Sequence, residues 1–382
     1  MNAVRHKDSG KAEWGERDVV PLSPAVREAN RRNKVVPRAC PPLFWRACPW
    51  GSTESRKLIS GGSTLVRDIP NLKSLGLIAA IFVVLLILPP ILPRFYTYIL
   101  TLMFVTGLLA MSLNMVVGHG GMFQFHHAAF YGVGAYAFGL ILKKTSLPFW
   151  TAFAAGPVAA AACGLLIGLF CVRLTRLYFG MLQISLGSLL WAIVFRWYGF
   201  TGGGDGIYGI PMPSVLSSAK SSYYFILIVL AISLVLIYLI FKSPFGATLL
   251  AIRDNPERCE AIGINVKRHQ VAGIVIATFF AGVAGNLFVV LERSVFPDLL
   301  FWVLSLEIFI MCLLGGWFTF MGPLLGAAIT VALRTFVGIY TEYWTLILGV
   351  ILILLIFFLP EGVMGYAMEK FGSQRYESGD RG

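Results

Sequence analysis

Long apolar runs recur along most of this 382-residue chain, and they constrain its fold more than any other feature. An α-helix needs about 20 predominantly apolar residues to cross the hydrocarbon core of a bilayer. Helices and closed barrels alone satisfy their backbone hydrogen bonds in lipid, so helix-length runs predict an all-α polytopic membrane protein with about ten transmembrane helices, between nine and eleven. The ten candidate runs cover residues 74–93, 96–117, 121–142, 149–172, 178–199, 222–241, 269–291, 300–320, 323–340 and 343–359.

The composition supports the membrane assignment. Apolar residues make up 57% of the chain and charged residues only 13%, whereas about a quarter of the residues in a soluble domain are charged. The third run is the least regular, because residues 118–134 are rich in glycine and contain the adjacent histidines His126 and His127. Glycine inside a span is tolerated where neighbouring helices satisfy the freed backbone groups. We therefore expect this run to be broken or re-entrant.

One short polar island, SPFGATLLAIRDNPERCEAIGIN at residues 243–265, separates the sixth run from the seventh. Asn255 is a good helix N-cap, and Pro256 suits the first position of a helix. Gly263 stands where a left-handed residue would end that helix. The pattern predicts a short helix over residues 256–262, held in water at the membrane surface. The alternative is an ordinary solvated loop.

The distribution of positive charge predicts the orientation. The first 73 residues hold 14 of the 31 lysine and arginine residues and seven acidic ones. The positive-inside rule then places both termini and the polar island in the cytoplasm, and residues 201–211 outside. Lys143 and Lys144 are the exceptions, because they fall on the outer side. We attribute the net charge of +12 to topology rather than to binding of nucleic acid. Further basic residues at the cytoplasmic face are Arg173, Arg176, Lys242, Arg253, Arg258, Lys267 and Arg268.

Three regions follow from these patterns. Residues 1–73 form a basic N-terminal extension that we expect to be disordered in the cytoplasm, or else translation starts further downstream. Residues 74–365 form the transmembrane domain, and residues 366–382 form a cytoplasmic tail. The six cysteines show no disulfide or metal-ligand spacing.

Motifs for catalysis and nucleotide binding are missing from the sequence. It contains no GxxxxGK[ST] phosphate loop, no GxSxG and no HExxH. His119, His126 and His127 lie close together but lack a local cysteine or carboxylate partner, so we expect neither a metal nor a cofactor. The stretch TGGGDGIYG at residues 201–209 follows a span rather than a strand, which predicts a glycine turn on the outer face, with Asp205 capping the next segment.

Several stretches, in order, resemble the LivM-type permease subunit of branched-chain amino acid ABC importers. The resemblance covers about residues 75–365, with one departure: His126 stands where the family usually has glycine. The matching stretches are the island followed by VKRHQVAGIVIATFFAGVAGNLF, SLNMVVGHGGMFQFHHAAFYGVGAYA (112–137), RLYFGMLQISLG (176–187), TGGGDGIYGIP (201–211), LLGGWFTFMGPLLGAA (313–328) and LPEGVMG (359–365).

The resemblance implies a permease subunit of the inner (plasma) membrane, surrounded by lipid and without ATPase activity of its own. Its implied partners are a second homologous permease, two cytoplasmic ATPase subunits and an extracytoplasmic solute-binding protein. Branched-chain amino acids are the first substrate class; related small amino acids, urea, amides and aromatic acids are alternatives. The resemblance also implies that the island is the coupling helix on which the ATPases dock, formed by Arg253, Asn255, Pro256, Glu257, Glu260, Ala261 and Gly263.

Ionisable residues inside apolar spans are costly and are therefore candidates for the transport pathway. Glu307 and Arg334 lie inside such runs, and His127 is a third candidate. A structural salt bridge between Glu307 and Arg334, or snorkelling toward headgroups, explains them equally well. Small residues at 152–156, 159–164 and 281–285 predict close helix packing.

Two other classes of protein remain as alternatives. A secondary transporter would carry its own ion-coupling site and usually shows internal repeats, and we see no convincing repeat here. A membrane enzyme would need a catalytic constellation, which the sequence does not contain.

Overall fold

The computed structural model describes residues 83–145, 147–174, 176–340, 343, 346–347, 349–351 and 362–365. All of them belong to the second of the two units into which the chain divides, residues 68–382. The predicted N-terminal extension 1–73, the C-terminal tail 366–382 and most of the tenth run lie outside the described residues.

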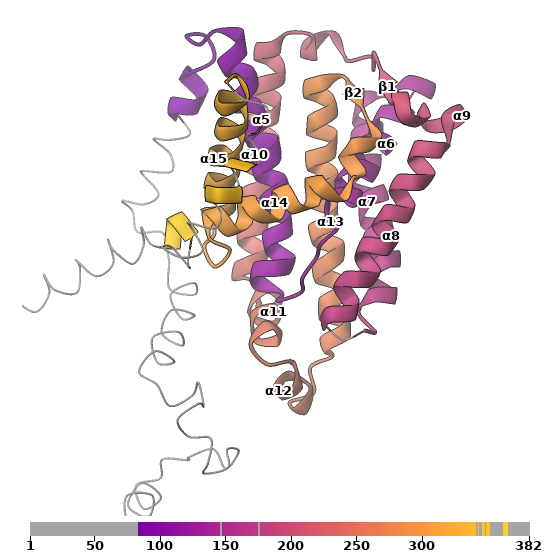
Figure 1. The fold of residues 1–382 in the computed structure, drawn as a ribbon, viewed down its shortest axis with the longest axis vertical. Helices are drawn as coiled ribbons and strands as arrows, with labels where there is room; N and C mark the ends of the chain where they lie inside the picture. The colour runs from indigo at the N-terminus through magenta and orange to yellow at the C-terminus, as the bar shows by residue number, and fades with distance from the viewer. Residues whose placement is uncertain are drawn as a thin grey trace, which may run out of the picture. The chain divides into compact units, whose positions relative to one another are not determined.

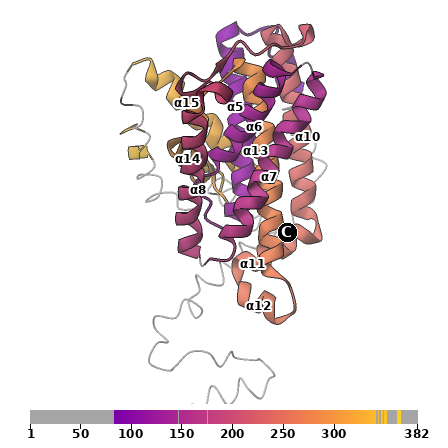
Figure 2. The ribbon, with the colours of Figure 1, turned by 90° about the vertical axis from the view of Figure 1, so that its right-hand side faces the viewer.

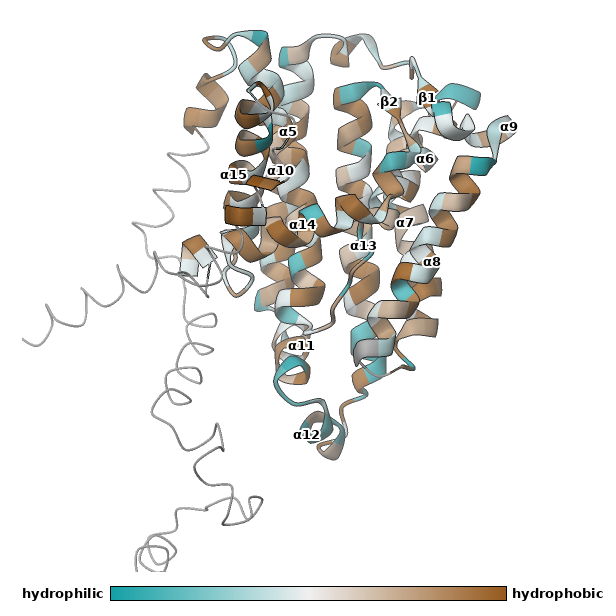
Figure 3. Ribbon diagram, in the orientation of Figure 1, coloured by the Kyte–Doolittle hydropathy of each residue, from teal (hydrophilic) through white to brown (hydrophobic). Residues whose placement is uncertain are grey.

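Five of the described helices are long and apolar enough to cross a membrane. Their surfaces are largely hydrophobic along their length (Figure 3). The class of all-α polytopic membrane protein is therefore confirmed. The five are α5 (Arg94–Asn114), which continues into the π-helix η2 (Met115–His119), and α7 (Phe149–Cys171), α8 (Arg176–Arg196), α10 (Ala219–Lys242) and α13 (Val266–Glu292).

Three predicted spans form shorter helices. They are α6 (Ala128–Lys144, 17 residues), α14 (Trp302–Gly315, 14 residues) and α15 (Gly322–Gly338, 17 residues). At 1.5 Å per residue these helices are about 21 to 26 Å long, less than the hydrocarbon core of about 30 Å. The third run is broken as expected, because residues 120–127 are not helical and α6 begins only after them. A second break, residues 316–321, separates α14 from α15.

Short elements gather at one end of the long helices (Figure 1). The strands β1 (Ile207–Tyr208) and β2 (Ser294–Val295) pair there in antiparallel register. Gly202, Gly203, Gly206 and Gly209 all have positive φ, as a glycine turn requires. The elements α9 (Tyr198–Thr201), η3 (Gly203–Asp205) and η4 (Ser214–Leu216) also lie at this end, whereas η5 (Pro297–Leu300) packs against the first turns of α6 at Gly132. The predicted cap by Asp205 is wrong, because the strand β1 comes next and the following helical turn, η4, has Pro213 at its N-cap.

Lys143 and Lys144 lie at this same end, which accounts for their place outside the positive-inside pattern. Lys143 Nζ donates to the Tyr208 carbonyl at 2.8 Å. Lys144 Nζ donates to the carbonyls of Gly199 at 3.1 Å and Phe200 at 2.8 Å. The two ammonium groups thus serve as hydrogen-bond donors to loop carbonyls on that face.

Helix α13 is central, and small residues let it approach α6 and α7 almost backbone to backbone. A Cβ added at Gly134 of α6 would lie 2.6 Å from Gly282 Cα of α13. A Cβ added at Gly282 itself would lie 2.8 Å from Pro157 Cα of α7. The predicted close packing through residues 152–156, 159–164 and 281–285 is confirmed, in the way expected for helices in lipid.

One hydrogen bond between α13 and α7 corrects a defect in α7. Pro157 has no N–H, so the carbonyl of Phe153, four residues earlier, loses its helical donor. Asn286 of α13 is fully buried, and its Nδ2 donates to that carbonyl at 2.6 Å. A proline inside a membrane helix is tolerated when a neighbouring helix satisfies the freed group, as here.

We expect Asn286→Ala to destabilise the folded protein by about 1 kcal/mol, because the Phe153 carbonyl would lose its donor inside the apolar bundle. In a Pro157→Ala background residue 157 donates to Phe153 again, so the same Asn286→Ala change should cost much less. Thermal unfolding of the four proteins in detergent measures this coupling. An equal loss of stability on Asn286→Ala in the parent and in the Pro157→Ala background would contradict the role assigned to the Asn286–Phe153 hydrogen bond.

Candidate functional site

The polar island forms a helical hairpin at the end of the bundle opposite β1 and β2 (Figure 1). Its two helices are α11 (Pro244–Asp254) and α12 (Pro256–Ala261). Of the two, α12 extends past the ends of the long helices, as the second view also shows (Figure 2). We call residues 243–265 the polar hairpin.

The caps predicted for α12 are present at both ends. The Asn255 side chain accepts from the Arg258 amide at 3.0 Å. At the other end Gly263 has φ +88°, its amide bonds to the Glu260 carbonyl, and the Ile264 amide bonds to the Cys259 carbonyl at 3.0 Å. These two crossed bonds form a Schellman motif. The expected helix over 256–262 is thus found within one residue.

Sequence reasoning missed the longer helix α11. Its cap repeats the pattern of α12, because the Ser243 side chain accepts from the Gly246 amide and Pro244 occupies the first position. Its buried residues, Gly246, Leu249 and Ile252, recur every three residues. The Ser-Pro pair and this spacing are the sequence features that could have revealed it.

A small apolar cluster fixes the hairpin to α13. Ile252 of α11, Cys259 of α12 and Val266 of α13 are all buried together, with Ile264 packed against them. Asn265 then caps α13 by accepting from the Arg268 amide at 3.1 Å. Thus α12 is joined to the central helix by a capped, tightly folded connection rather than by a loose loop.

Most of the predicted coupling residues lie on the water-exposed side of this hairpin. Glu257, Glu260, Ala261 and Gly263 are exposed, and Ile262 next to them is 75% exposed. A shallow hollow of about 380 Å³ lies between Glu260 and the connection to α13, lined by Glu260 and residues 263–267. Ile262 is thus an exposed apolar side chain beside two exposed carboxylates, on a helix capped at both ends.

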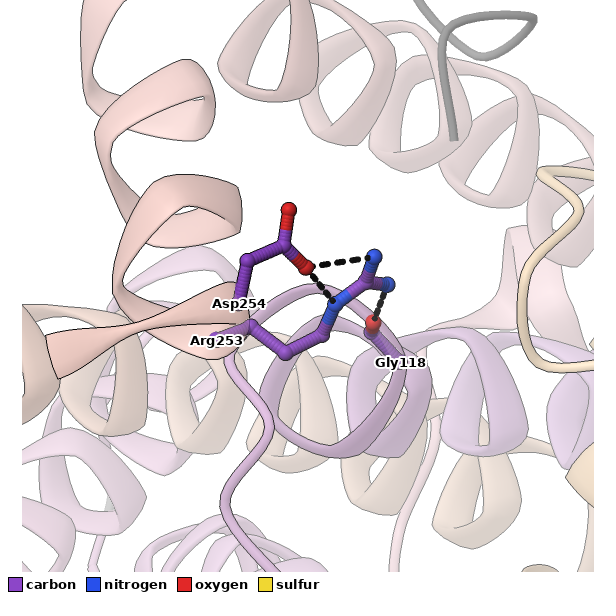
Figure 4. Close-up of polar contacts among 3 residues, drawn as sticks. All are labelled: Gly118, Arg253 and Asp254. Carbon is purple, nitrogen blue, oxygen red and sulfur yellow. Dashed lines mark hydrogen bonds and ion pairs between the residues drawn. The ribbon is translucent and has the colours of Figure 1, made fainter. Parts of the chain in front are cut away.

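Arg253 is placed differently, because its side chain turns toward the bundle and is only 18% exposed (Figure 4). Its Nη1 donates to the Gly118 carbonyl at 2.7 Å. Its Nη2 and Nε lie 3.2 and 3.3 Å from Asp254 Oδ1. Its guanidinium carbon lies 5.3 Å from the centre of the Phe318 ring.

Of the three candidates for the transport pathway, Glu307 and Arg334 lie beside each other, and His127 lies beside Ser112. Arg334 Nη1 lies 3.6 Å from Glu307 Oε1, so the structural salt bridge weighed from the sequence is present. His127 is fully buried, with Nε2 2.8 Å from Ser112 Oγ. Beside it, the amide of Ala128 at the start of α6 donates to Ser305 Oγ of α14 at 3.0 Å.

A group of buried polar side chains lies around the first break, and of its members only His126 was noted in the sequence. Gln124, His126 and Gln183 are buried, and their polar side-chain atoms have no hydrogen-bond partner. His126 packs on α8 so closely that a Cβ at Gly187 would lie 2.4 Å from its Cγ. Among the described residues, no group of three His, Cys, Asp or Glu side chains is placed to hold a metal.

The family profile described as "Branched-chain amino acid transport system / permease component" matches residues 95–356. The chain is similar to the high-affinity branched-chain amino acid transport system permease protein LivM of Escherichia coli, at 26% identity over 81% of this chain and 79% of that protein. It is also similar to the probable branched-chain amino acid transport permease protein LivM of Methanocaldococcus jannaschii, at 23% identity over 67% of this chain and 89% of that one. A solved structure, PsaBC from Streptococcus pneumoniae in complex with Fab, aligns with a TM-score of 0.42 and 14% identity over 76% of this chain and 99% of that one.

We expect Gly263→Val to open the C-terminal end of α12. A left-handed φ costs a β-branched residue about 1 kcal/mol or more, so the crossed bonds of the Schellman motif should open roughly fivefold more often. Amide hydrogen exchange of residues 263 and 264 measures this. Gly263→Asn is the matched control, because asparagine tolerates this φ and should exchange nearly as slowly as the parent. Equal exchange in the valine variant would refute the role of the glycine.

Proposed function

This chain belongs to the family of permease components of branched-chain amino acid transport systems, and we propose that it is a transmembrane subunit of an ABC importer that moves branched-chain amino acids into the cytoplasm. It carries no phosphate loop, so the energy comes from ATP bound by separate subunits. Its proposed partners are a second permease, two cytoplasmic ATPase subunits and an extracytoplasmic solute-binding protein.

The polar hairpin is the observation that carries this proposal. The helix α12 is capped at both ends, exposed on its outer side, and joined directly to the central helix α13. A short rigid helix in this position can receive a push from a partner and pass it to the bundle. The exposed carboxylates Glu257 and Glu260 suit a basic surface on that partner, because complementary charge guides docking.

The substrate class rests on the relatives. Both LivM proteins named above align over most of this chain, and their names give branched-chain amino acids as the transported class. Related small amino acids, urea, amides and aromatic acids are the outcomes that a transport assay would distinguish. Each compound is added to an assay of labelled leucine uptake, and a compound that the protein transports should lower that uptake.

The orientation proposed is the one that positive charge favours. The polar hairpin faces the cytoplasm of an inner-membrane protein, both termini lie in the cytoplasm, and the glycine turn at residues 201–211 faces outside. The glycine turn and the hairpin lie at opposite ends of the described helices, as this orientation requires (Figure 1).

We expect Glu260→Lys to abolish uptake while the protein still inserts in the membrane. The lysine would face a basic partner surface and should weaken docking of the ATPases roughly thirtyfold. Co-purification of the ATPases with the tagged permease from its own host measures the docking directly. Asp205→Lys, the same charge change on an exposed residue of the opposite end, is the control and should retain the ATPases. Normal uptake with the ATPases attached in Glu260→Lys would refute the docking role.

The orientation has its own test. A membrane-impermeant maleimide should label Asp205→Cys in intact cells and should label Lys267→Cys only in inverted vesicles, each compared with the parent chain and its native cysteines. Both positions are exposed, so access to the reagent depends on the side of the membrane. Labelling in the reverse pattern would overturn the proposed topology.

A further inference from the structure

Arg253 belongs to the polar hairpin but faces the bundle. We propose that Arg253 is a positioning residue that links the hairpin to the two breaks in the transmembrane helices, so that movement of a docked partner reaches the membrane domain through it. This inference rests on the proposed function of the hairpin as the ATPase-docking element. It assigns Arg253 a different role from the exposed residues of α12.

The first contact of Arg253 completes a long helix. The continuous helix of α5 and η2 covers 26 residues and ends at His119, just before the first break. The last carbonyls of a helix lack intrahelical donors, and its C-terminal end favours a positive charge. The guanidinium of Arg253 supplies a hydrogen-bond donor and a positive charge at this helix end, because its Nη1 donates to the Gly118 carbonyl at 2.7 Å. Displacing Arg253 therefore leaves the Gly118 carbonyl without this donor, while backbone amides still cap the carbonyls of residues 115–117.

The second contact places the stem of Arg253 against the break itself. Gly121 has φ +64°, and a Cβ added there would lie 2.5 Å from Arg253 Cγ. The close approach is possible because residue 121 has no side chain. On its other side the guanidinium lies over the ring of Phe318, within the second break at residues 316–321. One side chain of the hairpin thus touches both non-helical connections.

These connections are where the membrane domain can change shape. Large changes in φ and ψ are absorbed by a few residues in loops or at the ends of elements, whereas a helix moves as a body. The polar hairpin is fixed to α13 by the cluster around Ile252, so it moves with α13. Arg253 reaches from that body to the breaks. A cavity of about 60 Å³ beside it, lined by residues 120–123, Pro256 and Gln270 among others, leaves space at this junction.

Asp254 sets the direction of the guanidinium. Its Oδ1 accepts from both Nε and Nη2, which orients the remaining donor, Nη1, toward Gly118 (Figure 4). Lysine could keep the charge and one donor at this position. It could not form the same fork, because it has a single ammonium group.

The test uses the full chain in complex with its ATPases, isolated from its own host and reconstituted in vesicles with the solute-binding protein. We expect Arg253→Met to keep the ATPases bound and hydrolysing ATP, while uptake of labelled leucine falls on the order of tenfold, the size of a typical coupling between two sites. The ratio of ATP hydrolysed to substrate moved should rise accordingly. Arg253→Lys should restore part of the uptake. Arg268→Met removes an exposed arginine just beyond the hairpin and should leave the ratio unchanged.

A pair of glycine variants tests the same junction from the other side. Gly121 and Gly209 share φ +64°, so alanine imposes the same backbone strain at both. Only at residue 121 would the new Cβ meet Arg253, since nothing lies within 4 Å of a Cβ at Gly209. We expect Gly121→Ala to raise the ratio of ATP hydrolysed to substrate moved and Gly209→Ala to leave it unchanged.

Each contrary result has a distinct meaning. Wild-type uptake in Arg253→Met, or loss of its ATPases to the extent seen in Glu260→Lys, would overturn the positioning role. Failure of both Arg253 variants to accumulate in the membrane would also overturn it, in favour of a purely structural role. If Glu260→Lys keeps both its ATPases and its uptake, the docking function of the hairpin is wrong, whatever Arg253 does.

Discussion

The close approach of α13 to α6 and α7 is the constraint on which the rest of this structure depends. Glycines at 134 and 282 bring two helix backbones into contact, and Gly282 also lies against α7 at Pro157. Helices in lipid associate through such packing, because lipid supplies no hydrophobic force between them. Since the polar hairpin is attached to α13 by buried side chains, a force on the hairpin acts on this three-helix body as a whole. Under the proposed function, the two helix breaks are the places where the membrane domain would change shape.

Three irregular backbone groups in the described helices are matched by side chains from other elements. The Phe153 carbonyl freed by Pro157 accepts from Asn286, the Gly118 carbonyl at the first break accepts from Arg253, and the Ala128 amide that starts α6 donates to Ser305. Unsatisfied backbone groups are costly in the membrane, so these partners make the breaks possible. Movement of the element that carries the partner side chain therefore breaks the hydrogen bond at the irregular site.

Local features of this structure could be predicted from the sequence, and long-range ones could not. The cap at Asn255, the turn at Gly263 and the break before residue 128 follow from residue types that act on their own backbone. The inward turn of Arg253 depends on the Gly118 carbonyl, 135 residues earlier, which no local pattern indicates. The early end of α14 at Gly315 was also hidden, because the residues of the second break, GWFTF at 316–320, are apolar enough to extend the predicted run, whereas α15 lies close to its predicted bounds. The ion pair of Glu307 and Arg334 was one of three interpretations that the sequence left open, beside snorkelling and a place in the transport pathway.

The polar hairpin therefore has two sides with different chemistry. The exposed side presents Glu257, Glu260 and Ile262 to water, where a partner can bind and leave without disturbing the bundle. The inner side holds Arg253 against Gly118, where any displacement breaks a hydrogen bond at the end of a long helix. Under the proposed function, separate substitutions only a few residues apart would change docking strength and coupling strength. A hairpin of two capped helices provides this separation, because a single loop could not hold both sides in fixed directions.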